Sequence, residues 1–323
     1  MNTTLDSQLD GSFKVSLPKM PRKSSWLGSV KRDKWMYVLL LPGLLYFLIF
    51  KYLPMWGIVI AFQNYQPFLG FWNSEWVGLE NFRNFFSNPD FFRLLRNTFI
   101  LAMYDLVFFF PAPILIALLI NEVRIAAFKR LIQTMVYVPH FISMVIVASM
   151  SYVFLTTNGG IVNEIIVRLT GGSINFLADP SWFRPLIIMQ IIWKETGWGT
   201  IIFLAALASV DVEQYEAAIV DGASRFQRLW FVTVPAISST IVILLILRLG
   251  NFLDNGFEQI FLMTNSLNRS VADVFDTYVY FVGITQGAFS YSTAIGLFKS
   301  VIGIILIYGS NSLAKRFGQE GIL

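Results

Sequence analysis

Six stretches of this 323-residue chain are each long and apolar enough to cross a lipid bilayer. A helix needs about 20 mostly apolar residues to cross roughly 30 Å of hydrocarbon. The stretches run from Trp35 to Phe62, Thr98 to Ile120, Gln133 to Leu155, Pro185 to Ala208, Ile237 to Phe257 and Thr293 to Leu313. Because hydrocarbon offers no water to backbone polar groups, such segments must be helical. The sequence predicts an all-α, polytopic membrane protein: a polar tail over residues 1–34, then a six-helix domain over residues 35–323.

Composition excludes several classes of protein. Hydrophobic residues make up 55% of the chain and charged residues 14%, whereas soluble domains carry about 25% charged residues. The chain has no cysteine, and His140 is its single histidine. We therefore predict no metal site and no catalytic residue. The net charge of +4 is not gathered into a basic stripe with aromatics, so we expect no nucleic-acid partner.

The basic residues predict how the chain is oriented in the membrane. Lysine and arginine are concentrated in the N-terminal tail and in alternate loops, including Arg124, Lys129 and Arg130 after the second predicted span. Cytoplasmic loops carry an excess of these residues. We therefore expect both termini in the cytoplasm.

The loop over residues 209–235, between the fourth and fifth predicted spans, has a patterned sequence. Asp211 with Gln214, and Ser224 with Gln227, can cap two short helices, and Gly222 lies between them. The first helix carries Glu216, Ala217 and Ala218, followed by Asp221. Small side chains let a partner's backbone approach closely, and carboxylates accept strong hydrogen bonds from its donors. The pattern predicts a docking segment for another protein.

Sequence motifs in this loop and elsewhere resemble those of known transporters. Glu216-Ala217-Ala218, Gly222 and Val234-Pro235 resemble the EAA motif of ABC-importer permeases, with Val232 and Val234 where that family usually has Ile and Leu. Further segments are similar to LplB-type carbohydrate permeases: Val77 to Phe82, Asn97-Thr98, Phe128 to Arg130, Tyr137 to Phe141, Asp276 to Tyr280 and Gly296 to Ser300. That group imports oligosaccharides or polysaccharide fragments, including acidic aldouronates and alginate.

The resemblance implies a type I ABC-importer permease of the bacterial cytoplasmic (inner) membrane. The expected partners are a second homologous permease, two ATPase subunits, an extracytoplasmic solute-binding protein and a saccharide. ATP and magnesium would bind the ATPase subunits, and this chain would hold no cofactor. The residues implied to couple ATP hydrolysis to alternating access are Glu216, Ala217, Ala218, Asp221 and Gly222.

Polar residues within the predicted spans are candidates for the substrate path. They are Gln190, Trp193, Lys194, Glu195 and Trp198 in the fourth span, Arg248, Asn251, Asp254 and Asn255 in the fifth, and Lys299 in the sixth. Ionisable residues inside a membrane usually face a bundle interior or a wet cavity, where they contact substrate or pair across helices. Both interpretations stay open. Lys194, Arg248 and Lys299 outnumber Glu195 and Asp254, an excess that would suit an anionic saccharide.

Two other classes of membrane protein and one other substrate are alternatives to an importer of acidic saccharides. An ion-coupled secondary transporter should show inverted repeats and would leave the EAA-like loop without a purpose. A membrane-embedded enzyme acting on lipid-linked sugars would need clustered carboxylates near the interface. A neutral oligosaccharide is an alternative substrate. His140 is interpreted as a packing or hydrogen-bonding residue rather than a proton carrier.

Overall fold

The computed structural model describes residues 33–316 and 318, so nearly all of the predicted N-terminal tail lies outside the described residues. The chain divides into two compact units at Trp56 and Gly57. The first unit holds α2 (Lys34–Phe47), the π-helix η1 (Leu48–Tyr52) and the start of the 3₁₀-helix η2 (Leu53–Phe62). These elements form one helical stretch from Lys34 to Phe62 that is apolar and long enough to span a membrane. It coincides with the first predicted span.

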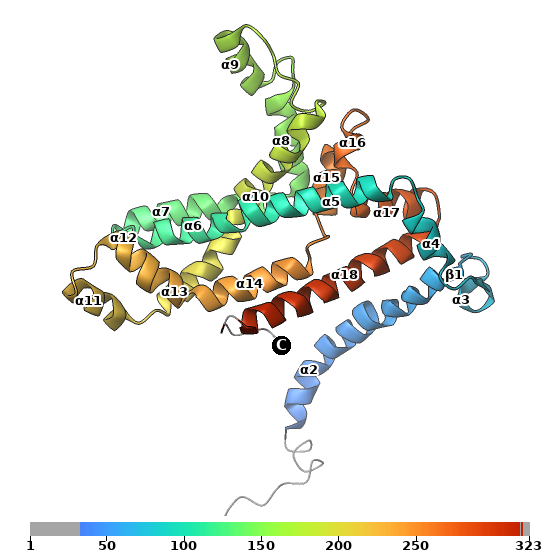
Figure 1. The fold of residues 1–323 in the computed structure, drawn as a ribbon, viewed down its shortest axis with the longest axis horizontal. Coiled ribbons are helices and arrows are strands. Elements are labelled where there is room, and N and C mark those ends of the chain that lie inside the picture. Colours follow the sequence, from blue (N-terminus) through green and yellow to red (C-terminus); the bar gives the residue numbers. More distant parts are fainter. Residues whose placement is uncertain (1–32, 317, 319–323) are drawn as a thin grey trace, which may run out of the picture. The chain divides into compact units, whose positions relative to one another are not determined.

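The second unit is almost entirely helical (Figure 1). After η2 it contains β1 Gln63–Asn64, α3 Gly70–Asn73, β2 Glu75–Trp76, α4 Glu80–Phe86, α5 Phe91–Tyr104, the π-helix η3 Asp105–Phe109, α6 Pro111–Asn121, α7 Ala126–Tyr137, the 3₁₀-helix η4 Val138–Phe141, α8 Met144–Leu155 and α9 Ile161–Thr170. It continues with α10 Pro180–Ala208, α11 Val212–Val220, α12 Arg225–Arg228, the π-helix η5 Leu229–Thr233, α13 Val234–Ala236, α14 Ser238–Gly250, α15 Phe257–Met263, α16 Arg269–Ala272, α17 Phe275–Tyr280, the π-helix η6 Phe281–Thr285 and α18 Phe289–Arg316. The two short strands pair antiparallel, with Gln63 opposite Trp76.

Four of the predicted spans are continuous helices in the structure. Besides Lys34–Phe62, these are Phe91–Asn121, Pro180–Ala208 and Phe289–Arg316. Three of them begin four or more residues earlier than predicted, at Phe91 instead of Thr98, at Pro180 instead of Pro185 and at Phe289 instead of Thr293. Asp179 caps the start of α10, where its carboxylate accepts a hydrogen bond from the Ser181 N–H at 2.8 Å. This bond and a second from the Ser181 hydroxyl hold the pKa of Asp179 below its usual range.

The predicted third span, Gln133 to Leu155, is two helices that meet at a sharp bend. Ala126–Phe141 and Met144–Leu155 meet at an angle of 98°. Pro139 has no N–H to donate within η4, and the chain is extended at Ile142 and Ser143. The Ser143 hydroxyl then accepts a hydrogen bond from the Ile146 N–H and starts α8.

The predicted fifth span, Ile237 to Phe257, is also corrected. Its helix is α14, which ends at Gly250, and Arg225–Ala236 precedes it at a bend of 57°. Residues 251–256 form turns and irregular chain before α15. Gly256 has a φ of +75°, a left-handed conformation that glycine adopts without steric cost.

Small residues let the long helices of the second unit approach one another closely. A Cβ atom at Gly197 of α10 would lie 2.0 Å from the Val136 carbonyl oxygen of α7. In α18, a Cβ atom at Gly303 would lie 2.6 Å from the Gly250 carbonyl oxygen of α14. Close backbone approach at small residues is the usual way in which membrane helices pack.

Candidate substrate cavity and coupling loop

A cavity of about 670 Å³ lies in the second unit, bordered by α5, η3, α10, the end of α14 and the segment that leads into α15. Its lining includes seven of the predicted path residues: Lys194, Glu195, Trp198, Arg248, Asn251, Asp254 and Asn255. The predicted placement of Arg248, Asn251, Asp254 and Asn255 in the fifth membrane-spanning helix is wrong for all but Arg248, because α14 ends at Gly250. The chain beyond Gly250 nevertheless returns the other three residues to the same cavity.

Three predicted path residues do not line this cavity. Gln190 is buried, and its side chain bonds to Ser151 Oγ at 2.7 Å and to Gln259 Nε2 at 2.9 Å. Trp193 is 45% exposed and does not border the cavity. Lys299 borders a second hollow of about 260 Å³, which shares Asn251 and Asp254 with the larger cavity.

Arg248 and Asp105 form an ion pair at the cavity wall. Arg248 Nε donates to Asp105 Oδ2 at 2.6 Å, and Arg248 Nη2 donates to Asp105 Oδ1. Asp105 opens the π-helix η3, where the Phe110 N–H donates to the Asp105 carbonyl oxygen. The Phe109 ring lies below the guanidinium, with its centroid 5.1 Å from Arg248 Cζ. The pair therefore joins α14 to η3.

Lys194, Glu195 and His140 form a second polar cluster at the bend of the third span. Lys194 Nζ donates to Glu195 Oε1 at 2.6 Å and to the His140 carbonyl oxygen at 3.1 Å. His140 Nδ1 lies 2.7 Å from Glu195 Oε2, and its ring stacks on Trp198 at 4.6 Å between centroids. The expected hydrogen-bonding role of His140 matches these contacts. The cluster fixes the bent segment to α10.

Lys299 of α18 contacts two carboxylates, those of Asp254 and Asp276. Asp276 also accepts a hydrogen bond from the Asn255 N–H at 3.3 Å. These bonds tie the irregular segment after α14 to both α17 and α18. Arg248 and Lys299 therefore match the interpretation of the intramembrane charges as interhelical ion pairs, whereas the ion pair of Lys194 is with Glu195, its neighbour on α10.

The positive excess inferred from the sequence does not hold at the cavity. Its lining carries the carboxylates of Asp105, Glu195, Asp254 and Glu258 against the cations Lys194 and Arg248. Sequence reasoning missed Asp105 and Asp276 as partners of the cations. A lone aspartate inside an otherwise apolar run was the available signal for Asp105, since such residues are costly without a partner.

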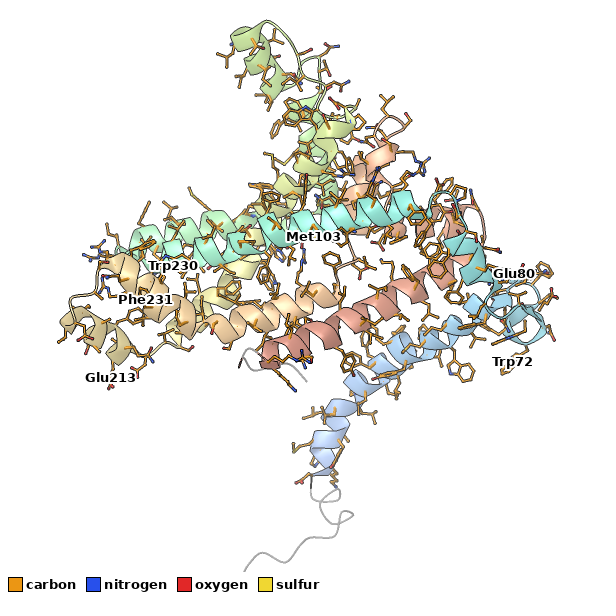
Figure 2. All side chains as sticks on the ribbon, viewed as in Figure 1. Trp72, Glu80, Met103, Glu213, Trp230 and Phe231 are labelled. Carbon is orange, nitrogen blue, oxygen red and sulfur yellow. The ribbon has the colours of Figure 1, made fainter. Side chains whose placement is uncertain are left out.

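The loop after α10 folds as the two predicted short helices, α11 and α12. Asp211 caps α11 through the Glu213 N–H, and Ser224 with Gln227 forms a capping box on α12. Glu216, Ala217, Asp221 and Gly222 are exposed, and Ala218 is partly exposed. Tyr215 donates to Thr233 Oγ1 at 3.1 Å and connects α11 to η5. Glu213, Trp230 and Phe231 lie at the end of the second unit opposite Trp72 and Glu80 (Figure 2).

Comparison with known proteins identifies the class. The chain belongs to the family of binding-protein-dependent transport system inner membrane components, which it matches over residues 99–319. It is therefore a multi-pass permease component of an inner membrane and not an enzyme.

Named relatives and a solved structure are similar over almost their whole length. Protein LplB of Bacillus subtilis (strain 168) is 68% identical over 92% of this chain and 94% of its own. The polygalacturonan/rhamnogalacturonan transport system permease protein YteP of the same organism is 54% identical over 99% of both chains. A chain in the crystal structure of a bacterial alginate ABC transporter, in complex with its alginate pentasaccharide-bound periplasmic protein, is 38% identical. It superposes with a TM-score of 0.85 over 93% of this chain and 100% of that one.

Proposed function

We propose that this chain is one permease subunit of an ATP-driven ABC importer that moves oligosaccharides or polysaccharide fragments, including acidic ones, into the cytoplasm by alternating access. The observation that carries the proposal is the cavity, which places Arg248, Asp105, Lys194, Glu195 and Trp198 among apolar helices. Carboxylates and amides bond to sugar hydroxyls, and an indole offers a flat apolar face to a sugar ring.

An acidic substrate is supported by the relatives. YteP is named for polygalacturonan and rhamnogalacturonan, and the solved transporter for alginate. The mixed charges of this cavity do not by themselves select an anion. We infer that the second permease and the extracytoplasmic binding protein contribute to selection. A neutral oligosaccharide is the alternative substrate.

We assign coupling to the exposed loop of α11 and α12. Glu216 and Asp221 present carboxylates beside Ala217 and Ala218, a surface that suits the donors and backbone of an ATPase subunit. Gly222, with a φ of +78°, makes the turn between the two helices. Two ATPase subunits would hold ATP and magnesium and move this loop. With the loop in the cytoplasm, both chain termini are also cytoplasmic.

Uptake by the reconstituted transporter tests the proposed substrate class. The chain is assembled in liposomes with its cognate permease, ATPase subunits and binding protein, and uptake of a labelled oligogalacturonate is measured with and without internal ATP. We expect ATP-dependent uptake of the oligouronide. Uptake of its carboxyl-reduced, neutral counterpart alone would replace the acidic substrate with the neutral alternative, and uptake of neither would contradict saccharide import.

A further inference from the structure

We propose that Arg248 binds the carboxylate of an acidic saccharide in transit, and that Asp105 and Phe109 hold its guanidinium ready for that contact. This role of Arg248 rests on the proposed saccharide import and makes Arg248 a residue that determines substrate specificity.

The pairing with Asp105 occupies only one edge of the guanidinium. Arg248 uses Nε and Nη2 toward the two oxygens of Asp105. An arginine side chain has five N–H donors in a planar fork, so the two on Nη1 and one on Nη2 remain. Among the described residues none accepts a hydrogen bond from Nη1. The free edge is therefore available to a ligand in the cavity.

The side chain of Arg248 is more exposed than those of the other two cations, Lys194 and Lys299. Its side chain is 41% exposed, whereas that of Asp105 is 13% exposed. Lys194 and Lys299 are 14% and 11% exposed, and each contacts a carboxylate and one further acceptor. Among the described cations that border the two hollows, Arg248 is the one that a substrate can reach directly.

The π-helix explains why Arg248 is held in this orientation. Pro111 and Pro113 have no N–H to donate into the preceding turn, and the chain forms i to i+5 bonding over Asp105–Phe109. This wide turn brings both Asp105 and Phe109 to Arg248. The carboxylate fixes one edge of the guanidinium and the ring supports one face. An oriented donor loses less conformational freedom when a ligand binds.

The chemistry of the free edge favours a carboxylate over a hydroxyl. Charge-assisted bonds between guanidinium and carboxylate are roughly twice as strong as those between neutral groups. The substrate carboxylate can take the free edge while Asp105 keeps the other, so both carboxylates contact the same guanidinium. A neutral sugar can use the same donors only through weaker hydroxyl bonds.

Kinetics with two matched substrates test this role. Initial uptake is measured for the oligogalacturonate and for its carboxyl-reduced counterpart, using wild type, Arg248→Gln, Arg248→Lys and Asp105→Asn. We expect Arg248→Gln to raise KM for the acidic substrate about tenfold or more, with little change for the neutral one. Arg248→Lys keeps the charge without the fork and should show a smaller rise with the same selectivity, as should Asp105→Asn.

The controls separate failure of this inference from failure of the proposed function. Lys315→Gln removes an exposed cation of α18 outside both hollows and should match wild type. If wild type imports neither substrate, the proposed function fails. If wild type imports the acidic substrate and the Arg248 variants leave both KM values unchanged, or raise both equally, Arg248 is not a carboxylate-binding residue. Should Arg248→Gln fail to copurify with its partner subunits, the same criterion applies to Arg248→Lys.

Discussion

At the scale of single residues, glycine is needed at position 222 because of the backbone conformation there and not because neighbouring atoms leave no room for a side chain. Its φ is +78°, and a Cβ atom built there would meet nothing within 4 Å. A side chain at this position therefore strains the local conformation without colliding with a neighbour. The sequence predicted this turn correctly because both its capping residues and its glycine are local signals.

Two substitutions of Gly222 distinguish the effect of backbone strain from the effect of an added side chain. Gly222→Val should destabilise the turn between α11 and α12 by roughly 1–2 kcal/mol, because L-residues are disfavoured in the left-handed region. Gly222→Asn adds a side chain of similar size but tolerates that region. We expect ATP hydrolysis stimulated by the loaded binding protein to fall several-fold for the valine variant and to be largely retained for asparagine. Equal losses would show that bulk at the docking surface, and not the turn, matters.

The partners of the intramembrane charges could not be predicted from the sequence. Arg248 and Asp105 are 143 positions apart, so no local periodicity connects them. The sequence showed which side chains are expensive to place in a membrane. It could not show that Lys299 meets Asp276, because that contact depends on how α17 and α18 pack.

At the scale of elements, the apolar runs predicted where helices exist but not where they break. The third span bends at 98° because Pro139 and Ser143 act together in one short segment. The helix of the fifth span ends at Gly250, where the polar residues Asn251, Asp254 and Asn255 begin to alternate with apolar ones. Hydropathy reports the average polarity of a segment and is insensitive to the few residues that end a helix.

Two glycines of α18 provide a matched test of helix packing. A Cβ atom at Gly303 would lie 2.6 Å from the Gly250 carbonyl oxygen, whereas one at Gly296 would meet nothing within 4 Å. Gly303→Ala should destabilise the subunit by roughly 1–3 kcal/mol through overpacking. Gly296→Ala should be neutral or slightly stabilising, since alanine is the better helix former. Thermal unfolding of the purified subunit in detergent measures both, and a Gly303→Ala midpoint equal to wild type would argue against the close crossing of α14 and α18.

At the scale of the whole molecule, the chain's lack of cysteine makes the orientation testable. Glu213 and Glu80 are exposed and lie at opposite ends of the second unit (Figure 2). In intact cells, a membrane-impermeant maleimide should label Glu80→Cys, and should label Glu213→Cys only after the membrane is opened. The reverse pattern would overturn the cytoplasmic assignment of the coupling loop and the termini.

The central claim is that ATP hydrolysis on partner subunits drives saccharide import through α11 and α12. The most direct measurement is the ATPase rate of the complete complex in liposomes, with empty and with oligouronide-loaded binding protein, for wild type and Glu216→Lys. We predict stimulation by the loaded binding protein in wild type. It should be lost when the exposed carboxylate becomes a cation, while membrane insertion stays normal. A Glu216→Lys complex that binds its ATPase and is stimulated like wild type would contradict the account.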